Sequence, residues 1–175
     1  MNANTREVRI TMKGNPVALM GTPPREAETA PDFKVVDEAF KPVKLSDFKG
    51  KVVLISAVPS LDTGVCSLQT QRFNAEATHL PSNVVILTIS EDLPFAQKRF
   101  CETEKIGGIK VLSDSVWHEF GTAYGIRIEN MGLLARSVWI VGRDGKIAYR
   151  QIVAEVTTHP DYDAALKAVR EVAAQ

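Results

Sequence analysis

Two continuous apolar runs, Val52–Val58 and Val84–Ser90, constrain the fold of this chain most strongly. Short runs of this kind are typical of strands that are buried on both faces. The segment between them, Val65–Leu80, places its apolar residues on about one half of a helical circumference. These residues are Val65, Leu68, Phe73, Ala77 and Leu80. The alternation of buried strands with an amphipathic helix predicts an α/β fold.

Shorter elements surround this central unit. A hairpin over about residues 7–20 is predicted from strand-like runs, Glu7–Met12 and Val17–Met20, around a Gly-Asn-Pro turn. The other expected elements are a hairpin of Phe33–Val36 and Val43–Leu45, a helix from Pro94 to about Glu104, a strand Ile109–Leu112, a helical segment Val116–Tyr124, antiparallel strands Arg136–Val141 and Lys146–Val153, and a final helix capped by Thr158. This order predicts one thioredoxin-like domain over residues 1–175, an α/β fold whose mixed central sheet is flanked by helices, with an added N-terminal β-hairpin.

Charge and hydropathy exclude several classes of function. The 175 residues carry 21 Lys and Arg against 21 Asp and Glu, so no basic surplus is available for nucleic acid. The apolar runs are far shorter than the roughly 20 residues that a membrane-spanning helix requires. The first residues, Met1–Glu7, lack the basic start and apolar stretch of a secretory signal, which favours a cytoplasmic, reducing location. We therefore expect neither nucleic acid nor a membrane as a partner.

Cys66, one of two cysteines, falls in the first turn of the helix that follows the first buried strand. A helix N-terminus favours negative charge, which stabilises a thiolate there. Cys66 also lies on the apolar half of this helix, where burial keeps a thiol protonated, so activation requires a nearby cation. The best candidate is Arg136, which alternates in phase with Val138 and Ile140 on a strand face that points to the core.

Each of these residues has a structural alternative. A lone cysteine in a helix is more often a small core hydrophobe. Thr63 could serve only as the N-cap of the helix, and Arg136 could extend to the surface at the end of its strand. The combination of these residues favours a reactive site.

Cys101 is expected on the polar side of its own helix. A helical projection places it beside Gln97, Lys98, Glu104 and Lys105, and opposite Phe95, Ala96, Arg99 and Phe100. An accessible thiol beside lysines suits thiol–disulfide exchange better than packing. The alternative is a tolerated surface cysteine in a reducing compartment.

Two thiols suffice for a peroxide-reducing cycle. A thiolate that meets a peroxide becomes a sulfenic acid, which condenses reversibly with a second thiol. A disulfide requires Cα atoms within about 7 Å, so we predict that the first turn at Cys66 and the segment at Cys101 partly unwind. The histidines are isolated and lack metal-ligand spacing, so they predict no metal site; they are His79, His118 and His159. No other cofactor is predicted, because the sulfur itself carries the two electrons.

Three longer strings carry a resemblance to a known family. They are PSLDTGVC at Pro59–Cys66, SEDLPFAQKRFC at Ser90–Cys101 and TTHPDYDAA at Thr157–Ala165. They resemble the bacterial thiol peroxidase group of the atypical two-cysteine peroxiredoxins, and the similarity covers nearly the whole chain. The resemblance implies reduction of hydrogen peroxide and alkyl hydroperoxides, thioredoxin as the reductant, and a homodimer.

The same resemblance implies a role for each site residue. Cys66 would be the peroxidatic cysteine, and Cys101 the resolving cysteine of the same subunit. Thr63 would offer its hydroxyl to the peroxide and the thiolate, Arg136 would orient both, and Pro59 would shield the pocket. Preorganised donors of this kind stabilise the charge that develops as the O–O bond breaks.

Two other functions are compatible with two redox-active cysteines. A thiol–disulfide oxidoreductase of the same fold would be expected to place them as Cys-x-x-Cys, a motif that this sequence lacks. A non-enzymatic redox sensor or holdase would use a Cys66–Cys101 disulfide to switch a binding surface. Repeated turnover with a general reductant distinguishes a peroxidase from a sensor that oxidises once.

Overall fold

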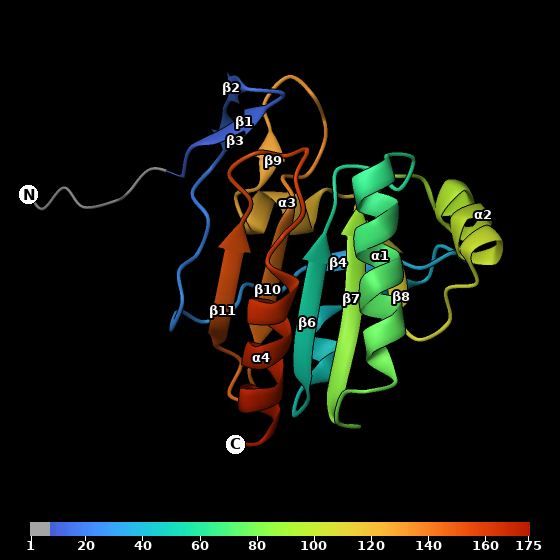
Figure 1. Ribbon diagram of the computed structural model, residues 1–175, viewed down its shortest axis with the longest axis vertical. Coiled ribbons are helices and arrows are strands. Elements are labelled where there is room, and N and C mark those ends of the chain that lie inside the picture. Colours follow the sequence, from blue (N-terminus) through green and yellow to red (C-terminus); the bar gives the residue numbers. More distant parts are fainter. Residues whose placement is uncertain (1–7) are drawn as a thin grey trace, which may run out of the picture.

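The computed structural model describes residues 8–175 and contains a seven-stranded mixed sheet with the strand order β11-β10-β6-β7-β8-β4-β5 (Figure 1). Its central strands β6 (Val52–Ala57), β7 (Val84–Ser90) and β8 (Lys110–Ser113) are parallel. Strand β10 (Ser137–Val141) lies antiparallel between β6 and β11 (Ile147–Ile152), which confirms the predicted C-terminal strand pair.

The second predicted hairpin forms the opposite edge of this sheet. Strand β4 (Lys34–Val36) pairs antiparallel with β8 and with β5 (Pro42–Lys44), and a short 3₁₀ helix, Leu45–Phe48, follows. The mixed sheet with flanking helices confirms the predicted thioredoxin-like fold.

Helices α1 (Gly64–Ala77) and α4 (Tyr162–Ala173) cover one face of the sheet (Figure 1). The short helix α3 (Glu119–Ala123) packs on the opposite face, and α2 (Pro94–Glu104) lies next to β8 (Figure 1). Because α1 follows the carboxyl end of β6, the β6–α1 loop lies at the same end of the sheet as the segments after β7 and β8.

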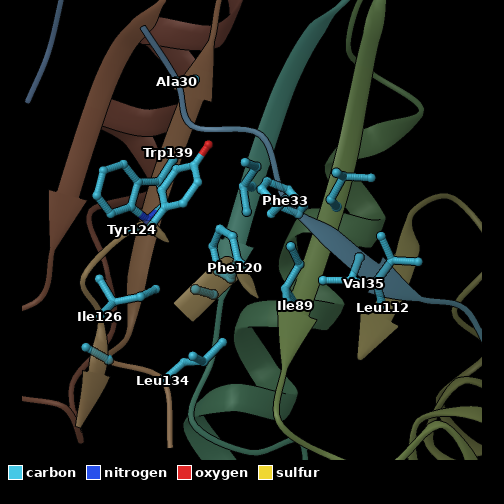
Figure 2. Close-up of a cluster of buried hydrophobic side chains, with 14 of the residues drawn as sticks. Ala30, Phe33, Val35, Ile89, Leu112, Phe120, Tyr124, Ile126, Leu134 and Trp139 are labelled. Carbon is cyan, nitrogen blue, oxygen red and sulfur yellow. The ribbon is translucent and has the colours of Figure 1, made fainter. Parts of the chain in front are cut away.

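Both faces of the sheet carry a hydrophobic core, which explains the unbroken apolar runs. Along β6, Val53 and Ile55 face one core, whereas Val52 and Leu54 face the other. Figure 2 shows the core on the α3 side, where aromatic rings pack edge to face. The rings belong to Phe33, Phe120, Tyr124 and Trp139.

The N-terminal hairpin is shorter than predicted. Strand β1 (Ile10–Met12) pairs antiparallel with β2 (Asn15–Val17). Val17–Met20 is not one strand, because β3 (Leu19–Met20) pairs instead with β9 (Arg127–Ile128). The first residue of the predicted hairpin, Glu7, lies outside the described residues.

Two predictions of helix ends are wrong. The N-cap of α4 is Asp161, whose carboxylate accepts a hydrogen bond from Ala164 N at 3.0 Å, whereas Thr158 donates its hydroxyl to Glu155 O. Helix α3 begins only at Glu119, because the Asp114 carboxylate accepts hydrogen bonds from the amides of Phe120 and Gly121.

Within residues 8–175, no helix is long and apolar enough to cross a membrane.

A buried carboxyl pair, Glu91 and Asp114, follows β7 and β8. A carboxyl oxygen of Glu91 lies 2.8 Å from His118 Nδ1. Burial, and secondly the charge of Asp114, raise the pKa of Glu91 to about 8. Burial also raises the pKa of Asp114.

This pair predicts a fall in stability with pH. Between 4.5 and about 8, the folded chain binds more protons at Glu91 than the unfolded chain does, so the free energy of unfolding falls as pH rises. In Glu91→Gln the fall should be smaller. Urea unfolding under reducing conditions at about pH 5, 7 and 9 measures it. Equal slopes for both proteins would contradict the assignment.

Candidate active site

Cys66 is the third residue of α1, and its side chain is fully buried. It packs in a small apolar cluster with Val58 and Leu61, against which Phe100 of α2 and Val111 of β8 also pack. Cys66 and Cys101 are both free thiols. The cluster therefore brings the helix that carries Cys101 next to the surroundings of Cys66.

Arg136 lies immediately before β10 and is only 2% exposed, which excludes the alternative that it extends to the surface. Its guanidinium donates from Nη2 to Cys66 Sγ at 3.2 Å, from Nη1 to Gln69 Oε1 at 2.9 Å and from Nε to Val156 O at 2.8 Å. No ion pair among residues 8–175 joins Arg136 to a carboxylate. A buried guanidinium without a carboxylate stabilises an anion at the one partner that ionises, the Cys66 sulfur.

Gln69 is a site residue that the sequence analysis missed. It is buried beside Cys66 on α1, and its amide nitrogen donates to Ser56 Oγ at 2.8 Å while its oxygen accepts from Arg136. The i, i+3 spacing from Cys66 is the signal that could have found it.

The buried face of α1 consequently differs from the prediction. Leu68 is 54% exposed, because the helix turns its polar residues Gln69 and Thr70 inward together with Cys66 and Phe73.

Thr63 occupies the N-cap position of α1 but does not cap the helix with its side chain. Its hydroxyl donates instead to Ser60 O at 3.0 Å and is exposed. An oxygen whose proton is committed in this way retains lone pairs that accept a hydrogen bond. Pro59 is buried at the start of the same loop, directly after Val58.

Asp92 anchors this loop and was also missed. Its carboxylate accepts hydrogen bonds from Ser60 Oγ at 2.7 Å, Leu61 N at 2.8 Å and Ser90 Oγ at 2.6 Å. Gln97 of α2 donates to the same Ser90 hydroxyl at 3.0 Å. One polar network thus ties the loop before Cys66 to the first turns of the helix that carries Cys101.

The predicted orientation of α2 is correct for Phe100, which packs against the Cys66 cluster, but wrong for Phe95 and Gln97. Phe95 is 71% exposed, whereas Gln97 is buried and also donates to Leu112 O at 2.8 Å. Cys101 lies one turn after Gln97 on this inward side and is half-buried. The first turns of α2 therefore bury Gln97 with its hydrogen bonds and leave Phe95 exposed.

The charges near Cys101 also differ from the expected lysines. Burial raises the pKa of the Cys101 thiol to about 11, and the neighbouring carboxylates of Glu38 and Glu102 add to the shift. In this conformation Cys101 is a protonated thiol at neutral pH, and such a thiol is a poor nucleophile.

The described residues offer no metal centre in place of thiol chemistry. Within residues 8–175, no three His, Cys, Asp or Glu side chains are grouped so that they could hold a metal ion.

Comparisons with known proteins show the family of this chain. The Redoxin family matches residues 25–166. A thiol peroxidase from Oceanobacillus iheyensis is 51% identical over 157 residues, which cover 90% of this chain and 95% of the relative. A thiol peroxidase from Listeria innocua is 48% identical over 163 residues, which cover 93% of this chain and 98% of the relative.

A solved structure shows the same fold. The crystal structure of a peroxiredoxin-like protein from Aquifex aeolicus superposes with a TM-score of 0.89 at 38% identity, covering 94% of this chain and 97% of that one. The chain belongs to the redoxin family, as a peroxiredoxin-type oxidoreductase of the thiol peroxidase group. Its general activity is that of a thiol-dependent peroxidase.

Proposed function

We propose that this chain reduces hydrogen peroxide and alkyl hydroperoxides through a Cys66 sulfenic acid, which Cys101 of the same subunit resolves. The observation that carries the proposal is the contact of 3.2 Å between the buried Arg136 guanidinium and Cys66 Sγ. A thiol buried in an apolar cluster without such a cation would stay protonated and inert.

In the first step the Cys66 thiolate attacks the terminal peroxide oxygen. The S–O bond forms as the O–O bond breaks, sulfur loses two electrons, and the alkoxide or hydroxide leaves and takes up a proton. Arg136 donates to the thiolate and the developing charge, and Thr63 accepts a hydrogen bond from the peroxide hydroxyl. Pro59 shields this step from water. No metal, haem or flavin enters, because sulfur carries both electrons.

In the second step the Cys101 sulfur attacks the sulfenic acid. The S–S bond forms, the S–O bond breaks, and the oxygen leaves as water after taking up the thiol proton. A dithiol reductant, for which thioredoxin is the proposed identity, then returns both cysteines to thiols. The two free cysteines fit a reducing compartment, and we propose the cytoplasm and a homodimer as the setting.

One equivalent of hydrogen peroxide added to fully reduced protein tests the proposal. We expect rapid loss of two thiols per chain, and non-reducing peptide mass spectrometry should find a Cys66–Cys101 link. Addition of thioredoxin, its reductase and NADPH should then sustain peroxide consumption.

Other outcomes count against the proposal. Slow loss of thiols, or oxidation confined to Cys101, would mean that Cys66 is not activated. Oxidation to the disulfide without sustained turnover would favour the redox sensor. Cys66→Ser is the matched control and should lose no thiol at the early times.

A further inference from the structure

The N-terminal hairpin forms a two-stranded sheet of its own and is hydrogen-bonded to the loop that follows β11. Thr11 N of β1 donates to Ala154 O at 2.7 Å, and Val156 N donates back to Thr11 O at 2.8 Å. Ile10, the first residue of β1, is buried in the core on the α3 side. A single parallel bridge between Thr11 and Glu155 therefore joins the hairpin to this loop.

Glu155 fastens these two segments together. Its Oε1 accepts hydrogen bonds from Thr11 Oγ1 at 3.0 Å and from Gly14 N, in the hairpin turn, at 2.7 Å. Its Oε2 accepts from Thr157 N at 2.8 Å and from Thr157 Oγ1 at 2.6 Å. One carboxylate thus binds the hairpin through one oxygen and its own loop through the other.

The bonds with Thr157, followed by that from Gly14 N, lower the pKa of Glu155 to about 2. The clamp is therefore ionised at every pH at which a peroxidase assay is practical.

The clamped loop also holds the guanidinium of the active site. Val156, the residue after Glu155, accepts the hydrogen bond from Arg136 Nε through its carbonyl while its amide is bonded to the hairpin. The same peptide segment begins at Val153, whose amide donates to Arg136 O at 2.9 Å. Two consecutive links, from Glu155 to Val156 and from Val156 to Arg136, end at the guanidinium that lies 3.2 Å from Cys66 Sγ.

We propose that Glu155 is a positioning residue for the peroxidase reaction, which acts by clamping the N-terminal hairpin to the loop whose Val156 carbonyl orients Arg136 toward Cys66. The inference rests on the proposed function, because it assigns to the hairpin a part in the same step. It explains why a hairpin outside the central sheet is bonded to the residue next to the Arg136 acceptor.

Glu155→Ala should release the loop. The Arg136 guanidinium would then be held less firmly in its orientation toward Cys66. We expect the second-order rate constant for the reaction with hydrogen peroxide to fall by about tenfold, within the roughly hundredfold that a displacement of about 1 Å can cost. The pH–rate profile should also move to higher pH, because a less well directed guanidinium stabilises the thiolate less. A purely structural role would lower the melting temperature and leave this profile in place.

Two further variants keep the test decisive. Glu155→Gln preserves the size of the side chain and one good acceptor, so it should fold normally and show an intermediate rate. Asp144→Ala removes a comparable turn carboxylate, which accepts from Lys146 N in the β10–β11 turn far from Cys66, and should react like the wild type.

A double-mutant cycle tests whether Glu155 acts through Arg136. If Glu155 acts through Arg136, Glu155→Ala should slow the reaction in the wild type but not in an Arg136→Met background. An unchanged rate and profile in Glu155→Ala, or an equal loss in both backgrounds, would overturn the inference alone. If Arg136→Met itself reacted like the wild type, the role assigned to Arg136 would fail and the inference with it, whereas the proposed function fails if hydrogen peroxide does not oxidise Cys66 in the wild type.

Discussion

A chain in which methionine replaces Arg136 is expected to react with hydrogen peroxide at least about a hundredfold more slowly than the wild type. Loss of one preorganised donor to a developing anion costs about 10²–10³ in rate, and Arg136 also places a positive charge 3.2 Å from Cys66 Sγ. Stopped-flow measurement of the first oxidation, before any reductant acts, reports this step directly.

Stability must be measured on the same variant. Replacing Arg136 removes the guanidinium that donates to both Val156 O and Gln69 Oε1. A buried acceptor that is left without a partner costs about 1–3 kcal/mol. A thermal unfolding curve shows whether the slow reaction belongs to a folded protein.

Two controls make the result specific. Arg136→Lys keeps the charge but not the fork of three donations, so its rate should lie between those of methionine and arginine. Arg150→Met removes another partly buried guanidinium, which donates to Pro23 O and Pro24 O, and should leave the peroxide reaction unchanged. A fast reaction in folded Arg136→Met would refute the assigned role.

The fold was predictable where apolar residues form unbroken runs. The residues of β6 and β7 form apolar runs because both faces of these strands are buried. This requirement applies to each residue in turn and is therefore visible in the sequence. Pairings between short, distant segments were not predictable, such as that of Leu19–Met20 with Arg127–Ile128. Strands of two residues carry no periodicity of their own.

The residues of the site also divide into those that local sequence patterns predict and those that depend on contacts between distant segments. The strand phase of Arg136 and the helix position of Cys66 are local patterns, and the structure brings these two residues together as expected. Asp92 and the Val156 carbonyl act through hydrogen bonds between distant segments, and backbone carbonyls leave no mark in a sequence. The orientation of the first turns of α2 was predicted wrongly because Gln97 is buried by its hydrogen bonds rather than by hydropathy.

Cys101→Ser is expected to abolish sustained peroxidase turnover while sparing the first oxidation of Cys66. Hydrogen bonds hold α2 at both ends, from Gln97 to Ser90 and Leu112 and, beyond the helix, from the amides of Gly107 and Gly108 to Asn74. With these anchors in place, we expect the turns around Cys101 to be the part that unwinds if the disulfide forms. Such unwinding should also remove Cys101 from the burial that raises its thiol pKa to about 11.

The variant separates the two chemical steps because serine cannot form the disulfide. One equivalent of hydrogen peroxide should be consumed at the wild-type rate, and a dimedone-type reagent should then label Cys66 as the sulfenic acid. Thioredoxin should sustain no further consumption at a comparable rate. Cys66→Ser provides the opposite pattern, with no first oxidation at all. A lost first oxidation in folded Cys101→Ser would contradict the division of roles, because Cys101 would then be needed before any sulfenic acid exists to resolve.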